Sequence, residues 1–269
     1  MPRYRQNKSI LQKNLQTAQK PSSRLRLVIF VLIGIIILLV PVLLIKKSNE
    51  QPGPSSNSQT TEPTFDKSKF SLDDPTSPWV VVNKQRPLSP KTYAPNGLRA
   101  PNIQLKGGKT TEAMQLTAET SQAVEALATA AQAEGLKFVL VSGYRSYNSQ
   151  KTIYDSEVKG FGQAVADQES ARPGHSEHQT GWAADLGRTD GKCEIEACFA
   201  DTAEGKWLAT NAHKYGFIIR YAKDKTSVTG YIYEPWHLRY VGSDLAAEMH
   251  RTNTETLEEF FGLSSAPTY

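Results

Sequence analysis

An apolar run over residues 27–45 (LVIFVLIGIIILLVPVLLI) constrains what this chain can fold into more than any other feature. It holds 19 uncharged residues, which as a helix just cross a hydrocarbon core of about 30 Å. Residues 1–26 contain seven basic side chains and no acidic one, whereas only Lys46 and Lys47 follow the run closely. By the positive-inside rule, the N-terminus stays in the cytoplasm. We therefore expect a single-pass protein of the cell membrane, with a cytoplasmic N-terminal segment, a transmembrane anchor at 27–45 and an extracytoplasmic remainder.

A cleaved signal peptide is the alternative interpretation of this apolar run. Signal peptides have a shorter apolar region of about 7–15 residues, followed by a small-residue cleavage site of the A-x-A type. The run is longer than that, and no such site follows it. An uncleaved anchor is therefore preferred, and either interpretation puts the rest of the chain outside the cytoplasm.

The composition changes after the apolar run. Residues 46–78 are rich in Ser, Thr, Pro, Asn and Gln, which is typical of a flexible linker. We expect one folded domain at 79–263 and a short tail at 264–269. The net charge of +4 comes from the N-terminus, since 22 basic and 27 acidic side chains follow Lys47. A domain without excess positive charge argues against a nucleic-acid partner, and we expect a monomer.

Hydrophobic periodicity and chain breakers predict a mixture of helices and short strands. Several strands follow one another closely, as in hairpins, so the predicted fold class is α+β with a central antiparallel sheet flanked by helices. Helices are expected at 111–134, 147–158, 207–215, 243–251 and 254–261. Strands are expected at 137–142, 183–186, 217–221, 230–233 and 237–241.

Cys193 and Cys198 are the only cysteines, and they enclose four residues. Outside the cytoplasm, a disulfide between them is the expected state. A zinc-binding pair is the alternative, but a single C-x4-C without a second pair is a poor zinc signature. Because the loop is short, the disulfide would add little chain-entropy stabilisation and would mainly shape a local loop.

Two short segments in the C-terminal half contain candidate metal ligands. The segments SEHQTGWAAD and EPWH supply two imidazoles, His178 and His237, and one carboxylate, Asp185. Such a set binds zinc and leaves a fourth position open for water, as in catalytic rather than structural sites. Glu234 is a nearby carboxylate outside the set that can take the proton of this water. The two segments therefore predict a zinc hydrolase.

Three motifs in order resemble those of a known family. SGYRS (142–146), S-x-H-x-x-G-x-A-x-D (176–185) and EPWHLRYVG (234–242) are similar to the signature set of VanY-type carboxypeptidases. These are zinc D-alanyl-D-alanine carboxypeptidases of the lysostaphin, D-Ala-D-Ala peptidase and sonic hedgehog group. The likeness covers about residues 81–242, and the occurrence of all three motifs makes it specific. It implies a hedgehog/DD-peptidase-like fold and zinc as the cofactor.

The resemblance also implies roles for individual residues, with a peptidoglycan stem peptide as the substrate. The zinc ligands would be His178, Asp185 and His237, the catalytic base Glu234, and the substrate-facing residues Arg145, Gln150 and Ser176.

Other histidines receive simpler interpretations. His175 lies three residues before His178 and competes with it as a ligand. Because the family pattern starts at Ser176, we assign His175 to the substrate side instead. His213 and His250 are interpreted as ordinary polar residues.

The expected reaction is hydrolysis of the C-terminal D-Ala from a stem peptide, with Glu234 activating water at the zinc. Arg145 would either clamp the terminal carboxylate or stabilise the tetrahedral oxyanion, and the sequence leaves both roles open. An L,D-carboxypeptidase and a peptidoglycan endopeptidase are alternatives on the same scaffold. A catalytically inactive cell-wall binding module is the alternative of another class, and the presence of Glu234 and Arg145 argues against it.

Overall fold

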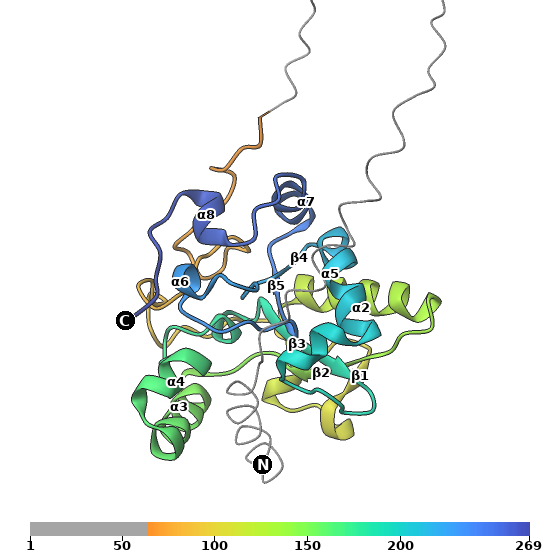
Figure 1. Ribbon diagram of the computed structural model, residues 1–269, viewed down its shortest axis with the longest axis horizontal. Coiled ribbons are helices and arrows are strands. Elements are labelled where there is room, and N and C mark those ends of the chain that lie inside the picture. The colour runs from red at the N-terminus through yellow and green to blue at the C-terminus, as the bar shows by residue number, and fades with distance from the viewer. Residues whose placement is uncertain (1–63) are drawn as a thin grey trace, which may run out of the picture. The chain divides into compact units, whose positions relative to one another are not determined.

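A five-stranded sheet organises residues 64–269, the part of the chain that the computed structural model describes (Figure 1). The strand order is β1-β2-β3-β5-β4, with β1 parallel to β2 and every other neighbouring pair antiparallel. Helices flank the sheet, so the expected α+β class with a mainly antiparallel sheet is confirmed. The strands are β1 (Gln104–Leu105), β2 (Phe138–Ser142), β3 (Ala183–Arg188), β4 (Phe217–Ile219) and β5 (His237–Tyr240).

Hydroxyl side chains start most of the longer helices. At the N-caps of four helices, a Ser or Thr oxygen accepts a backbone N–H of the first turn, which stabilises the helix start. One of these caps, Thr117, makes the first long helix begin later than the expected 111–134. The α-helices are α2 (Ala118–Ala133), α3 (Tyr147–Phe161), α4 (Gln163–Glu169), α5 (Ala203–Asn211), α6 (Thr226–Thr229), α7 (Ser243–Arg251) and α8 (Leu257–Phe261). The 3-10 turns are η1 (Lys106–Gly108), η2 (Glu112–Met114), η3 (Glu177–Thr180), η4 (Ala197–Asp201) and η5 (Ala212–Tyr215).

One expected strand, at 230–233, is wrong. Gly230 adopts a left-handed conformation (φ +82) and ends α6, so the chain turns at the point where the strand was expected to start. The N–H of Ile232 then bonds to the carbonyl of Gln168 rather than to a neighbouring strand. Alternating buried and exposed side chains in a loop had the same pattern as a half-buried strand. The other expected elements are present with shifted ends: the first helix begins at Ala118 rather than at 111, and the end of the helix expected at 207–215 is the 3-10 turn η5.

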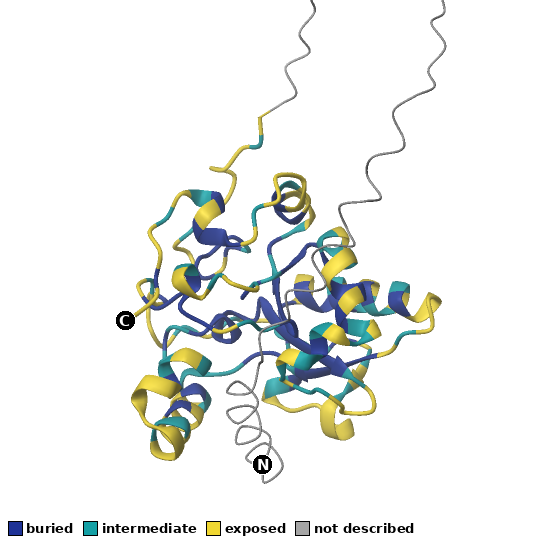
Figure 2. Ribbon diagram, viewed as in Figure 1, coloured by how far each residue is buried: buried dark blue, intermediate teal, exposed yellow. Residues whose placement is uncertain are grey.

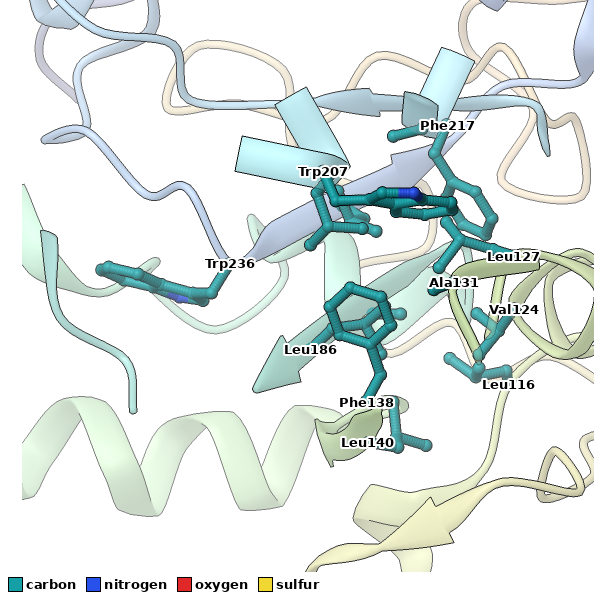
Figure 3. Close-up of a cluster of buried hydrophobic side chains, with 14 of the residues drawn as sticks. Leu116, Val124, Leu127, Ala131, Phe138, Leu140, Leu186, Trp207, Phe217 and Trp236 are labelled. Carbon is teal, nitrogen blue, oxygen red and sulfur yellow. The ribbon is translucent and has the colours of Figure 1, made fainter. Parts of the chain in front are cut away.

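One face of the sheet packs against α2 and α5 in the main hydrophobic core (Figure 3). Side chains alternate along a strand, and Leu140, Leu186 and Leu238 point to this face. Asp185 and His237, their neighbours in β3 and β5, therefore point to the opposite face. The helices contribute these core residues: Val124, Leu127, Ala131, Trp207 and Leu208.

A second core cluster joins the start of the described chain to α7 and α8. Trp79 and Val81 pack there with Leu245 of α7 and Phe260 of α8. Phe65 stacks on Trp79 with ring centroids 5.5 Å apart. The packed part of the chain therefore begins before residue 79, where the sequence suggested that the linker ends.

The C-terminal residues are packed as well. Ala266 is fully buried, and its N–H donates to the carbonyl of Val228. The ring of Tyr269 contacts His175 edge to face at 5.1 Å. Residues 264–269, expected as a tail, thus belong to the fold. Figure 2 shows buried positions along the strands and inner helix faces, with exposed positions on the outer faces.

No helix within residues 64–269 is long and apolar enough to cross a membrane. The anchor expected at 27–45 and the first part of the expected linker lie outside the described residues.

Candidate active site

The three predicted metal ligands meet on the sheet face opposite the main core. Asp185 of β3 pairs directly with His237, the first residue of β5, and on its other side with Ser142, the last residue of β2. His178 comes from η3, just before β3. Gly181 ends η3 in a left-handed conformation (φ +74) and donates its N–H to the His178 carbonyl. This tight turn explains the glycine in the motif and lets His178 and Asp185 come together.

The distances within this group fit a zinc ion. His178 Nε2 lies 3.3 Å from one oxygen of Asp185, and His237 Nδ1 lies 3.0 Å from the other. All three side chains are buried, and their ligand atoms lie within 4.8 Å of one another. Atoms bound at about 2.0–2.1 Å to a tetrahedral zinc are themselves roughly 3.3 Å apart. Two imidazoles and one carboxylate leave one tetrahedral position for water or substrate.

A backbone carbonyl determines which nitrogen His178 offers. His178 Nδ1 lies 2.6 Å from the carbonyl oxygen of Gly143, so Nδ1–H donates there and Nε2 faces Asp185. A Cβ at Gly143 would lie 2.5 Å from the backbone oxygen of Gln115. The glycine of the SGYRS motif is therefore required by a close backbone approach, which also puts its carbonyl beside His178.

His237 has a carboxylate on each side of its ring. Its Nδ1 lies 3.0 Å from Asp185, and its Nε2 lies 3.4 Å from Glu177. Burial opposes a charged imidazole, but hydrogen bonds to these two carboxylates raise the pKa of His237 to about 10. Each ring nitrogen thus faces a carboxylate, and a metal at Nδ1 requires that the remaining ring proton lie on Nε2, toward Glu177.

Glu177 lies at the centre of a buried charge network. Its Oε1 accepts hydrogen bonds from Arg220 Nε and Arg239 Nη1, both at 2.8 Å. Arg220 also donates to both oxygens of Glu258, at 2.7 and 2.9 Å. All of these side chains have no exposed surface. Although burial favours the neutral acid, Arg239 and Arg220 hold the pKa of Glu177 far below its ordinary value.

The motifs did not single out Glu177, which lies between Ser176 and His178 at a variable position of the pattern. A signal for it does exist in the sequence. Arg220 and Arg239 lie in apolar segments (FIIRY and HLRYV) that were expected as strands. A buried arginine is costly unless a carboxylate pairs with it, so these two residues indicate at least one buried acid nearby.

Glu234 approaches the ligand group from the loop before β5. Its Oε2 lies 3.8 Å from His237 Nδ1, and its side chain is 13% exposed. Burial raises the pKa of Glu234 to about 8, with a further contribution from the negative charge of Asp185. Among the described residues, none donates a hydrogen bond to this carboxylate. Glu234 is thus available to a water molecule beside the ligand group.

Arg145, just after β2, is held by hydrogen bonds to neutral groups. Its Nη1 donates to Gln150 Oε1 and its Nη2 to Ser142 Oγ, both at 3.0 Å. Gln150 is fully buried, and its amide donates to the carbonyl of Ala171 at 2.7 Å. Arg145 forms no ion pair with another residue of 64–269. An oriented, partly buried guanidinium without a carboxylate partner is suited to an anionic group of a substrate.

The remaining residues that the sequence analysis discussed do not belong to this group. Ser176 is buried at the start of η3. His175 contacts Tyr269 and is hydrogen-bonded to a backbone carbonyl, so its ring is not part of the ligand group. His213 and His250 stack on each other with ring centroids 3.6 Å apart, also outside the ligand group.

Cys193 and Cys198 form a disulfide, as expected from the sequence. Together with Glu196 they form a second cluster of residues of metal-ligating types. Because both sulfurs are in the disulfide, neither is a thiolate, and the alternative of a zinc-binding pair has no support.

Comparisons with known proteins agree with this geometry. Residues 113–243, which include the whole ligand group, match the VanY family model, described as D-alanyl-D-alanine carboxypeptidase. The putative carboxypeptidase YodJ of Bacillus subtilis (strain 168) is 40% identical over 216 residues, covering 77% of this chain and 78% of that protein.

Two solved structures are also similar. The LdcB LD-carboxypeptidase has a TM-score of 0.66 at 42% identity, covering 71% of this chain and 88% of that chain. A vancomycin-resistance D,D-pentapeptidase VanY in complex with Zn(II) has a TM-score of 0.55 at 32% identity, covering 69% of this chain and 98% of that chain. The likeness therefore extends beyond the motifs to most of the described fold.

Proposed function

This chain belongs to the VanY family of zinc D-alanyl-D-alanine carboxypeptidases, and we propose that it removes the C-terminal D-alanine of peptidoglycan stem peptides. The observation that best supports this proposal is the buried group of His178, Asp185 and His237 with Glu234 beside it. Two imidazoles and a carboxylate at zinc-like spacing suit metal-assisted hydrolysis, as does the adjacent acid, whose side chain accepts no hydrogen bond from the described residues.

We assign each residue a role in this reaction. His178 Nε2, Asp185 and His237 Nδ1 hold the zinc, as their separations suggest. Zinc bound there would polarise the scissile carbonyl and lower the pKa of water. Glu234 takes the proton of the attacking water and delivers it to the leaving amine. Its closeness to His237 supports that role, as does the lack of a hydrogen-bond donor to its carboxylate among residues 64–269.

Arg145 is proposed to bind the free carboxylate of the terminal D-alanine. Gln150 and Ser142 fix the orientation of its guanidinium, and no carboxylate of the described residues forms an ion pair with it. A planar fork of N–H donors matches a carboxylate better than a single oxyanion. Gln150 thus acts on the substrate through Arg145, while direct substrate contacts by Ser176 and His175 remain predictions.

Removal of D-alanine from a tetrapeptide by an L,D-carboxypeptidase reaction is a second candidate. It is favoured by the higher identity of this chain to the LD-carboxypeptidase structure than to the D,D-pentapeptidase structure. Both reactions release the same D-alanine with its carboxylate, so the proposed contact of Arg145 serves either. They differ in the residue before the cleaved bond, which is D-alanine in one case and an L-configured centre in the other.

Mass spectrometry of stem peptides distinguishes these activities. We expect the full-length protein, purified in detergent with zinc, to remove one D-alanine from a pentapeptide muropeptide and to lose this activity with a chelator. Shortening of a tetrapeptide instead would identify the L,D reaction. Cleavage of cross-linked dimers alone would identify an endopeptidase. Binding of all these muropeptides without cleavage would contradict the proposal and favour a binding module.

We also propose that residues 27–45 anchor the enzyme in the cell membrane, with the active site outside. The length of the apolar run and the excess of basic residues before it support this topology. We expect the full-length chain to fractionate with membranes and a chain lacking residues 1–45 but given a cleavable secretion signal to be released. Protease added to intact spheroplasts should digest the domain and spare the N-terminal segment. Recovery of the untruncated chain in the soluble fraction would contradict the anchor.

A further inference from the structure

We propose that Glu177 is a positioning residue that fixes the tautomer of His237, so that His237 presents Nδ1 to the zinc. The inference rests on the proposed zinc site. It adds Glu177 to the three proposed ligands as a residue that orients one of them. It is drawn from the contacts of Glu177, because neither the motifs nor the ligand geometry assigns a role to it.

The two oxygens of Glu177 have different partners. Oε1 accepts from both Arg220 and Arg239 at 2.8 Å, whereas Oε2 lies 3.4 Å from His237 Nε2. A carboxylate paired with two arginines remains ionised and can only accept hydrogen bonds. The group facing it on His237 must therefore be a donor, which keeps the proton on Nε2 and leaves Nδ1 for the metal.

The two histidines of the site need opposite tautomers. His178 donates Nδ1–H to the carbonyl of Gly143 and presents Nε2, whereas His237 presents Nδ1. Without an acceptor at Nε2, His237 would instead keep a proton on Nδ1, where Asp185 accepts it at 3.0 Å. That proton would occupy the direction of the metal. By accepting from Nε2–H, Glu177 therefore disfavours the competing Nδ1–H tautomer of His237.

The charge network keeps Glu177 itself in place. Arg220 links it to Glu258 of α8, and Asn83 donates to Glu258 at 2.8 Å. Arg239 also donates to the carbonyls of Pro78 and Val80. The network thus connects the N-terminal part of the domain, α8 and β5 to the imidazole of His237. Glu258 belongs to the same buried network but does not contact His237, which makes it a matched control.

A measurement on the unaltered protein tests the tautomer. In long-range ¹H–¹⁵N spectra of the full-length, zinc-loaded protein, we expect His237 to be protonated at Nε2 with zinc on Nδ1, and His178 to show the reverse. A His237 ring with zinc on Nε2, or with no proton on Nε2, would overturn the proposal.

A pair of variants tests the role of the carboxylate. In Glu177→Gln, the amide oxygen is needed by the two arginines, so the NH₂ group would face His237 Nε2. Two donors then oppose each other, and the ring shifts toward the Nδ1–H tautomer. We expect the zinc dissociation constant, measured by chelator competition, to rise about 10- to 100-fold. Glu258→Gln removes an equally buried charge from the same Arg220, and should leave zinc affinity within about threefold.

The outcomes separate this inference from the proposed function. Equal zinc affinity in folded Glu177→Gln and Glu258→Gln would overturn the positioning role while leaving the zinc site intact. Failure of the unaltered protein to bind zinc would instead refute the zinc site. If Glu177→Gln does not fold, zinc on Nε2 of His237 in the spectrum of the unaltered protein would still overturn the proposal.

Discussion

Glu234→Gln is expected to lower kcat by about 10²- to 10⁴-fold while the protein still binds about one zinc per chain. The amide has nearly the size of the acid, and Glu234 makes no hydrogen bond within the described part of the chain that the change would break. It cannot accept the proton of the attacking water, so the loss is confined to the chemical step. Stem-peptide kinetics and metal analysis on the same preparation provide the measurement.

His237→Ala is the matched comparison for this variant. It removes one of the proposed ligands, so both zinc and activity should be lost together. Glu234→Gln should therefore lose activity but keep zinc, whereas His237→Ala should lose both. Loss of zinc from Glu234→Gln would make Glu234 a ligand, and unchanged kcat would remove it from the reaction.

The group of His178, Asp185 and His237 was predictable because residue types that can bind zinc occur together in short motifs. Asp185 and His237 are close because β3 and β5 pair in register, and the sequence already indicated strands at both positions. Gly181, in its left-handed conformation, allows the tight passage from η3 into β3. Local sequence determines these features, so they can be recognised without knowing the rest of the fold.

Glu177 was missed for a reason that is equally physical. Its importance comes from Arg220 and Arg239, which are 43 and 62 residues away and reach it only in the folded chain. No local pattern records such a contact. The sequence offered only an indirect indication, namely two arginines in apolar segments, each of which needs a buried acid.

The ends of the domain were also poorly predicted. Residues 64–78 have the composition of a linker, yet Phe65 and Leu72 pack against the second core cluster. At the other end, the side chain of Tyr269 accepts the backbone N–H of Arg172 at 2.6 Å. A few aromatic or apolar anchors fix such segments, and average composition hides them.

Arg145→Lys is expected to lower kcat/KM roughly 10- to 100-fold, mainly through a higher KM, because it loses charged hydrogen bonds to the substrate carboxylate. Lysine keeps the charge but has no planar fork, and it cannot bind Gln150, Ser142 and a carboxylate together in the same geometry. Separate measurement of kcat and KM on the stem peptide that the enzyme cleaves tests this expectation.

The kinetic pattern of Arg145→Lys identifies what the guanidinium binds. A higher KM with little change in kcat indicates the carboxylate, which is bound equally in the ground state and the transition state. A lower kcat with unchanged KM would instead indicate the developing oxyanion, a contact made only in the transition state. Arg188→Lys is the control, since Arg188 ends β3 in partly exposed ion pairs with Asp190 and Glu204 and should change kinetics less than about twofold. Unaltered kinetics in Arg145→Lys would exclude Arg145 from the site, and the terminal carboxylate would then need another cation.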